Sequence, residues 1–391
     1  MRKEFLPFSR PTIGQEEINE VVDSLKSGWI TTGPKVQKFE NDFSRFVKSP
    51  YAISVNSATS GLHLAYLASG IKPGDEVITT PLTFISTISM LLALGAKPIL
   101  VDIDLKTLNI DSEKIEKKIS KKTKAIVPVH FAGLPCDLDK IHSLAKKFRL
   151  KVIEDAAHAV GSKFKGKMIG SLSDCTVFSF HPIKNMTTGE GGMITTSHKD
   201  WAEAMTLLRF HGMSKTAWKR YSKSGSPHYD IQNLGYKYNM MDIQASLGIH
   251  QLKKLSQFNK TRGAYAKKYH QAFSAFPEII LPQQPSYPHT HSWHLYVILL
   301  NTKKINLTRD EFIQKLSEQN IGAGIHFKAV HLHTFYKKFF SRQIKELPNA
   351  DFASRHILSL PLYPEMKEED LEDVIAAVSN TIKKYSKKAA I

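Results

Sequence analysis

FSFHPIKNMTTGEGG, residues 178–192, runs from a strand-like segment through a glycine-rich loop into a second strand-like segment, and it carries one lysine, Lys184. Three kinds of site suit such a loop: a phosphate-binding P-loop, a dinucleotide fingerprint and a covalently held cofactor. A P-loop requires G-x-x-x-x-G-K-[ST], and no such string occurs in the chain. A dinucleotide fingerprint requires spaced glycines that open a helix, whereas these glycines lead into a strand-like run. The loop therefore favours a covalently held cofactor.

Short β-branched runs alternate with helical patterns from about residue 51 to residue 196. This alternation predicts an α/β fold with a mainly parallel sheet covered by helices on both faces. Runs that are apolar throughout, such as ILV and AIVPV, agree, because strands of such a sheet are buried on both faces. The predicted strands are 51–55, 75–80, 97–103, 124–130, 151–156, 175–180 and 192–196, and the predicted helices between them are 61–69, 86–94 and 137–148.

Helical patterns flank this region. Residues 16–27 predict a helix whose apolar residues share one face: Ile18, Val21, Val22 and Leu25. Residues 241–273 predict one long helix with few breakers, which suits a bridge between two domains. A strand over 292–300, a helix that starts with the capping box Thr308-x-x-Glu311 and a closing helix over 368–385 follow it.

This change of character along the chain predicts two domains. We expect a large domain over residues 1–250, with the N-terminal segment included, and a small C-terminal α+β domain over residues 251–391. A chain of 391 residues is long enough for both.

The net charge is +18, and a basic surface attracts polyanions. The basic residues are spread over the chain and form no arm with interleaved aromatic residues, so we expect no nucleic-acid partner. Attraction to small phosphorylated substrates remains open.

Two cysteines, Cys136 and Cys175, are too few for a disulfide framework and favour a reducing cytoplasm. The N-terminus lacks the apolar core of a signal peptide, and the most apolar stretch, residues 85–96, is too short to span a bilayer. We expect a soluble cytoplasmic protein without membrane insertion.

Histidines cluster at two places in the C-terminal part. His289, His291 and His294 lie close together in the sequence, and three more follow between residues 326 and 333. No acidic residue is interleaved, and 17 histidines make chance clusters common. We expect no metal site.

Polar residues that follow the predicted strands carry the chemistry. In open α/β sheets, ligands bind beyond the carboxyl ends of the strands. Pyridoxal phosphate (PLP) requires a lysine for a Schiff base, an acid for the pyridine nitrogen, a phosphate cradle and a face for the ring. Lys184, Asp155, the segment Ser57-Ala58-Thr59 before a helix, and Phe84 occur in suitable places. This order of residues predicts a PLP site.

Long strings of the chain resemble the DegT/DnrJ/EryC1/StrS family of sugar aminotransferases. They include SGWITTGPKVQKFE, NSATSGLHLA, GDEVITTPLTF, VIEDAAHA, FSFHPIKNMTTGEGG, RFHG and LGYKYNMMDIQA. The resemblance implies the PLP-dependent transferase fold of type I, as in aspartate aminotransferase. It also implies that PLP is the cofactor.

The resemblance implies roles for individual residues. Lys184 would form the Schiff base, Asp155 would contact the pyridine nitrogen, and His158 would lie near the ring hydroxyl. Phe84 would stack on the ring, and the phosphate would be held by Ala58, Thr59 and Ser179, next to Ser57. Relatives that dehydrate sugars carry histidine in place of the lysine, so Lys184 indicates transamination.

Family members are homodimers with shared active sites. The segment 235–239 would therefore reach the phosphate of the partner's site. Many relatives read GYNYR where this chain reads GYKYN, so the contact falls to Lys237 or Asn239.

Within the family, further strings resemble the members that form UDP-4-amino-4-deoxy-L-arabinose for lipid A modification and polymyxin resistance. These strings are FLPFSRP, GYKYN, SWHLYVI, GIHFKAVH and SLPLYPEM. We expect glutamate to give its amino group, leaving 2-oxoglutarate, and a UDP-4-ketopentose to accept it. Other UDP- or dTDP-ketosugars, and a non-catalytic basic protein of the same fold, are the alternatives. Candidate nucleotide-sugar contacts are Thr31, Gly33, His181, Lys237, His326 and His331.

Overall fold

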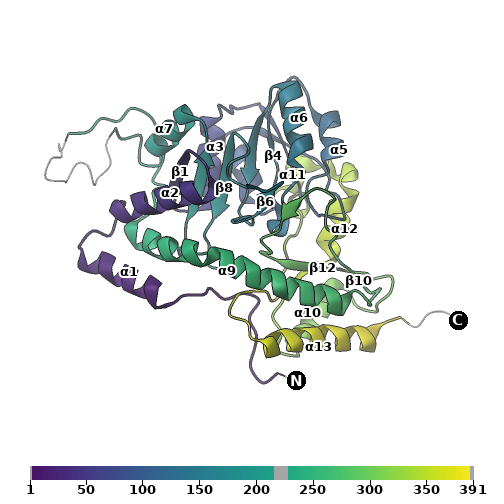
Figure 1. Ribbon diagram of the computed structural model, residues 1–391. Helices are drawn as coiled ribbons and strands as arrows, with labels where there is room; N and C mark the ends of the chain where they lie inside the picture. The colour runs from purple at the N-terminus through teal and green to yellow at the C-terminus, as the bar shows by residue number, and fades with distance from the viewer. Residues whose placement is uncertain (1, 215–227, 388–391) are drawn as a thin grey trace.

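A seven-stranded sheet lies at the centre of the protein (Figure 1). The computed structural model describes residues 2–214 and 228–387. The strand order is β1-β9-β8-β5-β4-β2-β3; β9 is antiparallel to both neighbours and the other adjacent pairs are parallel. The prediction of a mainly parallel mixed sheet is confirmed. The strands are β1 (Tyr51–Val55), β2 (Glu76–Thr79), β3 (Lys97–Leu100), β4 (Thr123–Val127), β5 (Lys151–Asp155), β8 (Cys175–Ser179) and β9 (Gly192–Thr196).

Helices cover both faces of this sheet (Figure 1). Neighbouring residues of a strand point to opposite faces, and Val177 and Phe178 of β8 accordingly belong to different hydrophobic clusters. One cluster packs against α2, α6 and α9, the other against α3, α4 and α7. The helices up to α9 are α1 (Gln15–Lys26), α2 (Pro34–Val47), α3 (Ala58–Ala68), α4 (Ser86–Ala93), α5 (Ser112–Ile115), η1 (Glu116–Lys118), η2 (Phe131–Gly133), α6 (Leu138–Phe148), α7 (Lys199–Leu208) and α9 (Asp242–Phe273).

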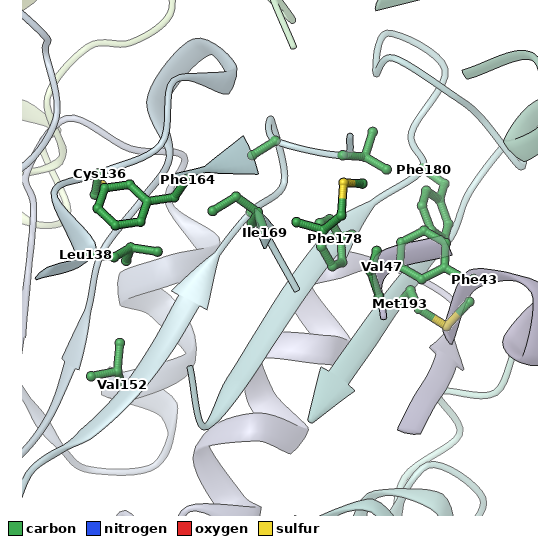
Figure 2. Close-up of a cluster of buried hydrophobic side chains, with 14 of the residues drawn as sticks. Phe43, Val47, Cys136, Leu138, Val152, Phe164, Ile169, Phe178, Phe180 and Met193 are labelled. Atoms are coloured by element: carbon green, nitrogen blue, oxygen red, sulfur yellow. The ribbon is translucent and has the colours of Figure 1, made fainter. Parts of the chain in front are cut away.

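The cluster on the α9 side is rich in aromatic side chains (Figure 2). Phe43 of α2 contacts Phe178 and Phe180, with ring centroids 5.2 and 5.6 Å apart. Cys136 lies in the same cluster, and both cysteines of the chain are buried and unpaired. This apolar layer fixes β8 and the residues that follow it.

A second, smaller unit follows. Strands β10, β12 and β13 form an antiparallel sheet that packs against α10 and α13 around Phe312, Leu316 and Val374. The expected α+β arrangement and the Thr308–Glu311 capping box are present. The remaining elements are β6 (Lys163–Phe164), β7 (Lys167–Met168), β10 (Ile279–Ile280), β11 (His289–Thr290), β12 (Tyr296–Leu300), α10 (Arg309–Ser317), η3 (Val330–Leu332), α11 (Lys337–Phe340), η4 (Ile344–Glu346), α12 (Pro348–His356), β13 (Ile357–Leu360) and α13 (Glu368–Tyr385).

Helix α9 connects the two units. Leu252 and Leu255 belong to the core under the large sheet, whereas Tyr269 and Phe273 belong to the core of the small unit. Leu6 also packs into the small core. The division at about residue 250 stays a proposal, because α9 passes through that position without interruption.

Helix α1 presents its apolar face to solvent. Ser24 Oγ lies 2.6 Å from Ser246 Oγ of α9, and the Nζ atom of Lys254 lies 2.7 Å from Glu17 Oε2, so polar contacts hold the inner face. The apolar residues that the sequence placed on one face are exposed or half-buried: Ile18 (47%), Val22 (40%), Leu25 (56%) and Val21. The expected amphipathic helix exists, but its apolar side does not face the core of its own chain.

The start of α3 corrects one prediction. The sequence predicts that this helix starts at Gly61, whereas it begins at Ala58. Ser57 caps it, because its Oγ accepts a hydrogen bond from the Ser60 N–H at 3.1 Å. The expected phosphate segment is therefore a cap and a first turn. No helix within residues 2–214 and 228–387 is long and apolar enough to cross a membrane.

Candidate active site

A cavity of about 460 Å³ opens at the carboxyl ends of the parallel strands. It brings together ten of the residues that the sequence singled out, namely Ser57, Ala58, Thr59, Phe84, Asp155, His158, Ser179, His181, Lys184 and His326. They come from the ends of β5 and β8, from the segments that follow β1, β2, β5 and β8, and from the small unit. The cavity volume is in the range of small-molecule sites.

Asp155 ends β5 inside this cavity and is almost completely buried. Its Oδ2 accepts a hydrogen bond from Thr87 Oγ1 at 2.7 Å, and its Oδ1 accepts one from the Ala157 N–H at 3.1 Å. Burial raises the pKa of the carboxyl group, and the two hydrogen bonds and the nearby Lys184 oppose that rise. The site thus holds a fixed carboxylate that a cationic ring nitrogen would stabilise.

Lys184 lies in the turn after β8, against the same cavity. Burial lowers the pKa of its amine to about 8, and the charge of Asp155 opposes that change. The turn is held by Asn185, whose Nδ2 donates to the Ser292 carbonyl and to Asn259 Oδ1, both at 2.7 Å. A positioned amine with a pKa near neutrality suits bond formation with an aldehyde and proton transfer.

His158 has a defined proton position. Its Nδ1 accepts a hydrogen bond from the Ala132 N–H at 3.2 Å, so the proton of the neutral ring is on Nε2. Burial holds the pKa of His158 well below its usual range, and the charge of Lys184 acts in the same direction. The ring stacks on Phe327 with centroids 5.6 Å apart. His158 is thus a neutral hydrogen-bond donor.

The first turn of α3 forms an anion site. The Ala58 and Thr59 N–H groups are the first two of the helix and have no carbonyl partner within it. A Cβ atom on Gly192 would lie 2.8 Å from the Ala58 nitrogen, so only glycine allows this approach of β9. Ser179 lines the cavity beside them. Backbone donors, a helix dipole and a hydroxyl match a phosphate group.

Five candidate residues do not line this cavity within the single chain. Asp242 holds the loop of Thr31 and Gly33: its carboxylate accepts from the Gly33 N–H at 2.8 Å, and its backbone N–H donates to the Thr31 carbonyl at 3.1 Å. Asn239 donates from Nδ2 to Thr32 Oγ1 at 2.6 Å, and the Lys237 Nζ lies 4.2 Å from the Phe210 ring centroid. His331 is buried, and neither of its ring nitrogens has a hydrogen-bond partner among the described residues.

A family comparison identifies the kind of protein that carries this cavity. The model of the DegT/DnrJ/EryC1/StrS aminotransferase family matches residues 11–379. The chain belongs to this aminotransferase family. The resemblance seen in the sequence is thereby confirmed at the level of the family.

Relatives match almost the full length of this aminotransferase. The spore coat polysaccharide biosynthesis protein SpsC of Bacillus subtilis is 49% identical over 386 residues, which cover 98% of each chain. The structure of PseC of Helicobacter pylori, an aminotransferase involved in the biosynthesis of pseudoaminic acid, matches with a TM-score of 0.91 at 31% identity, covering 98% of this chain and 100% of that one.

The protein Spr1654 of Streptococcus pneumoniae has been solved in a PMP form and a PLP form. The PMP form matches with a TM-score of 0.90 at 33% identity, covering 97% of this chain and 99% of that one; the PLP form has a TM-score of 0.89. These matches confirm the predicted PLP-dependent aminotransferase fold. The two forms also confirm, for this family, the cofactor that the sequence predicted.

The sequence did not predict the roles of several residues in and around the cavity of this aminotransferase. Phe327 packs between His158 and Phe84, and its ring centroid is 6.2 Å from that of Phe84. The hydroxyl oxygens of Thr83, which lines the cavity, and Thr87 lie 2.8 Å apart, and the Thr87 hydroxyl donates to Asp155. The spacing of four residues between these threonines is a signal that sequence reasoning could have used. Within the described residues, no group of three or more His, Cys, Asp or Glu is placed to hold a metal ion.

Proposed function

We propose that the protein is a PLP-dependent aminotransferase that moves the amino group of glutamate to the keto group of a nucleotide-linked sugar. One observation carries this proposal: Lys184 and Asp155 face the same cavity as the first turn of α3. An amine, a carboxylate and a phosphate site in one enclosure match the three polar ends of PLP. A sugar dehydratase of this family would carry histidine in place of Lys184, and a non-catalytic protein would not need a buried lysine in this cavity.

The residues of the cavity fit the cofactor. Asp155 would hold the pyridine nitrogen, and Nε2–H of His158 would donate to the ring hydroxyl. Ala58, Thr59 and Ser179 would hold the phosphate. Phe84, which lines the cavity and is 56% exposed, would stack on the ring. PLP, when bound, supplies an electron sink that stabilises charge on the reacting carbon and carries the amino group between the two substrates.

The chain itself contributes proton transfer and orientation. The amine of Lys184, with its pKa of about 8, would take a proton from the carbon of the amino donor and later give a proton to the carbon of the acceptor sugar. The Thr87 hydroxyl and the Ala157 N–H keep the Asp155 carboxylate in one orientation. His181 and His326 line the same cavity and would contact the sugar or its nucleotide, whereas buried His331 would act only through its neighbours.

The proposed enzyme is a homodimer with shared sites. Two observations support this: the apolar face of α1 is exposed, and Thr31, Gly33, Lys237 and Asn239 do not line the cavity of their own chain. A second copy would cover that face and receive those residues. Asn239 is 9% exposed and already hydrogen-bonded to Thr32, which makes Lys237 the better candidate to contact the phosphate in the partner's site.

The proposed compartment of the enzyme is the cytoplasm. Its two cysteines are both free, which suits a reducing compartment.

The acceptor sugar is the finer part of the proposal. The strings FLPFSRP, GIHFKAVH and SLPLYPEM favour a UDP-4-ketopentose, the precursor of a lipid A modification. The relatives SpsC and PseC, named for a spore coat polysaccharide and for pseudoaminic acid, favour another ketosugar. A panel of UDP-4-ketopentose, UDP- and dTDP-4-keto-6-deoxyhexose and a 3-ketosugar, with glutamate as donor, ranks them by kcat/KM. Turnover of the pentose at less than a tenth of another acceptor's rate would reject it.

Lys184→Ala tests the aminotransferase proposal itself. We expect transamination to fall by at least about 10³-fold, because the proton carrier is lost, and the visible absorbance of lysine-bound cofactor to disappear. Lys165→Ala is the matched control, since Lys165 is exposed and pairs with Asp139 away from the cavity. A Lys184→Ala enzyme that keeps the wild-type rate would refute the mechanism, whichever sugar is the substrate.

A further inference from the structure

A second cavity, of about 740 Å³, lies apart from the active site. It is enclosed by the end of α2, the β6–β7 hairpin, the middle of α9 and β11. None of its lining residues lines the Lys184 cavity. The proposed transamination gives this space no role.

Its charged side chains are all cationic. Lys48, Lys163, Lys167 and Lys260 line it, and no aspartate or glutamate does. None of the four has a carboxylate within 4.0 Å among the described residues. Lys165, at the tip of the same hairpin, is by contrast paired with Asp139. Four lysines without a carboxylate partner line one cavity, and their positive charges repel one another unless an anion lies between them.

Neutral hydrogen-bonding groups complete the wall. The hydroxyls of Ser171, Ser256 and Thr290 line the cavity. His291 accepts a hydrogen bond at Nδ1 from the Trp293 N–H at 2.9 Å, which places the proton of its neutral ring on Nε2 as a donor. Hydroxyl and N–H donors between ammonium groups suit oxygen atoms that carry negative charge.

We propose that this cavity binds a diphosphate group, either free or as part of a nucleotide. A diphosphate carries about three negative charges and many acceptor oxygens, which matches four lysines and several donors better than a single carboxylate would. The volume of about 740 Å³ also leaves room for a nucleoside. A long nucleic acid suits the site less well, because the lysines line a cavity and do not form an extended surface. Phe46 is also the one Phe, Tyr or Trp among the residues that line this cavity, so there is little aromatic surface for bases to stack on.

The lysines are the positions at which to test this site. Asn259 also lines it, but its Oδ1 accepts from Asn185, the residue after Lys184, at 2.7 Å. A change at Asn259 would therefore disturb the active site. Lys163 and Lys167 are exposed and do not line the catalytic cavity, so Lys163→Gln/Lys167→Gln should leave transamination unchanged. Lys121→Gln/Lys122→Gln removes the same charge from an exposed loop before β4.

Two measurements on the PLP-loaded enzyme decide the proposal. Calorimetry with pyrophosphate should give an affinity at least tenfold weaker for Lys163→Gln/Lys167→Gln and unchanged within twofold for the Lys121/Lys122 control. Mass spectrometry after lysine acetylation should show that pyrophosphate protects Lys163 and Lys167 but not Lys165. A UDP arm separates the sources: equal protection by UDP indicates the diphosphate alone, and protection at tenfold lower concentration indicates a nucleotide.

Either of two results would overturn the site. One is equal pyrophosphate affinity in the variant and the control; the other is the absence of selective protection at millimolar pyrophosphate. Protection by a short RNA at lower concentration than by either small ligand would replace the proposal with a nucleic-acid surface. These failures leave the aminotransferase proposal intact, because the Lys184→Ala test is independent of them.

Discussion

At the scale of single residues, Lys184 and Asp155 form a coupled pair. Burial disfavours the charged form of each, so it lowers the pKa of Lys184 to about 8 and raises the pKa of Asp155. The charge of each partner acts in the opposite direction. The cavity thus holds a carboxylate beside an amine whose pKa of about 8 is close to physiological pH, so a fraction of the amine is neutral there.

The pH dependence of cofactor attachment tests this coupling. Only the neutral amine attacks an aldehyde, so capture of PLP by the apoenzyme should rise with pH, with a midpoint near 8. Asp155→Asn removes the charge that raises the pKa of Lys184. The midpoint should therefore fall below 8, and capture at pH 7 should become several-fold faster, since a one-unit change in pKa is a tenfold change in equilibrium. Stopped-flow absorbance at several pH values measures it.

The control for this experiment is Asp139→Asn, which removes an exposed carboxylate outside the cavity. It should leave the midpoint unchanged. A midpoint that rises in Asp155→Asn would contradict the assigned direction of the coupling. A midpoint that moves equally in both variants would show only an effect of net charge.

At the scale of elements, two helix N-termini are satisfied in different ways. Ser57 caps α3 locally and leaves the Ala58 and Thr59 N–H groups free for a ligand. Helix α2 has Gly33 at its N-cap and no side-chain cap of its own. Asp242 of α9 takes that place, because it accepts from the Gly33, Lys35 and Val36 N–H groups at 2.8, 3.2 and 2.9 Å. One N-terminus is open for phosphate and the other is closed.

Asp242→Ala should be strongly destabilising for this reason. It leaves three backbone donors without their acceptor, two of them buried, and we expect a loss of about 2–4 kcal/mol in the free energy of unfolding. Urea unfolding followed by circular dichroism measures this loss. Asp242→Asn keeps one acceptor oxygen and should lose about half as much. Equal stability of Asp242→Ala and wild type would mean that water replaces the carboxylate at no cost.

At the scale of the whole molecule, local patterns predicted more than long-range contacts. The strands around Asp155 and Lys184, and the helix over residues 368–385, follow from alternation and periodicity within a few residues. The role of Phe327 could not be predicted, because the fold brings it to His158 from more than a hundred residues away. The Asp242 cap of α2 was missed for the same reason. The start of α3 was misplaced because Ser57 was taken for a ligand residue and not for a cap.

The exposed face of α1 gives the last prediction, which concerns the assembly. An amphipathic helix ordinarily turns its apolar side inward, yet here Glu17 and Ser24 are buried while Ile18, Val22 and Leu25 are 47%, 40% and 56% exposed. If a second copy covers this face, Val22→Asp/Leu25→Asp should place two charges in a desolvated interface. We expect the dimer to dissociate at micromolar concentration, measured by analytical ultracentrifugation, because each uncompensated buried charge costs several kcal/mol.

The same variant should lose activity together with the dimer. The segments that contain Gly33 and Lys237 do not line the cavity of their own chain, so a monomer would lack the partner residues that complete its site. Ala376→Asp/Asn380→Asp adds the same charge to exposed positions of α13 and should remain dimeric and active. A monomeric variant with full activity would separate assembly from catalysis and reject the shared site. A dimeric variant with full activity would place the interface elsewhere, because two aspartates on the α1 face would then meet only water.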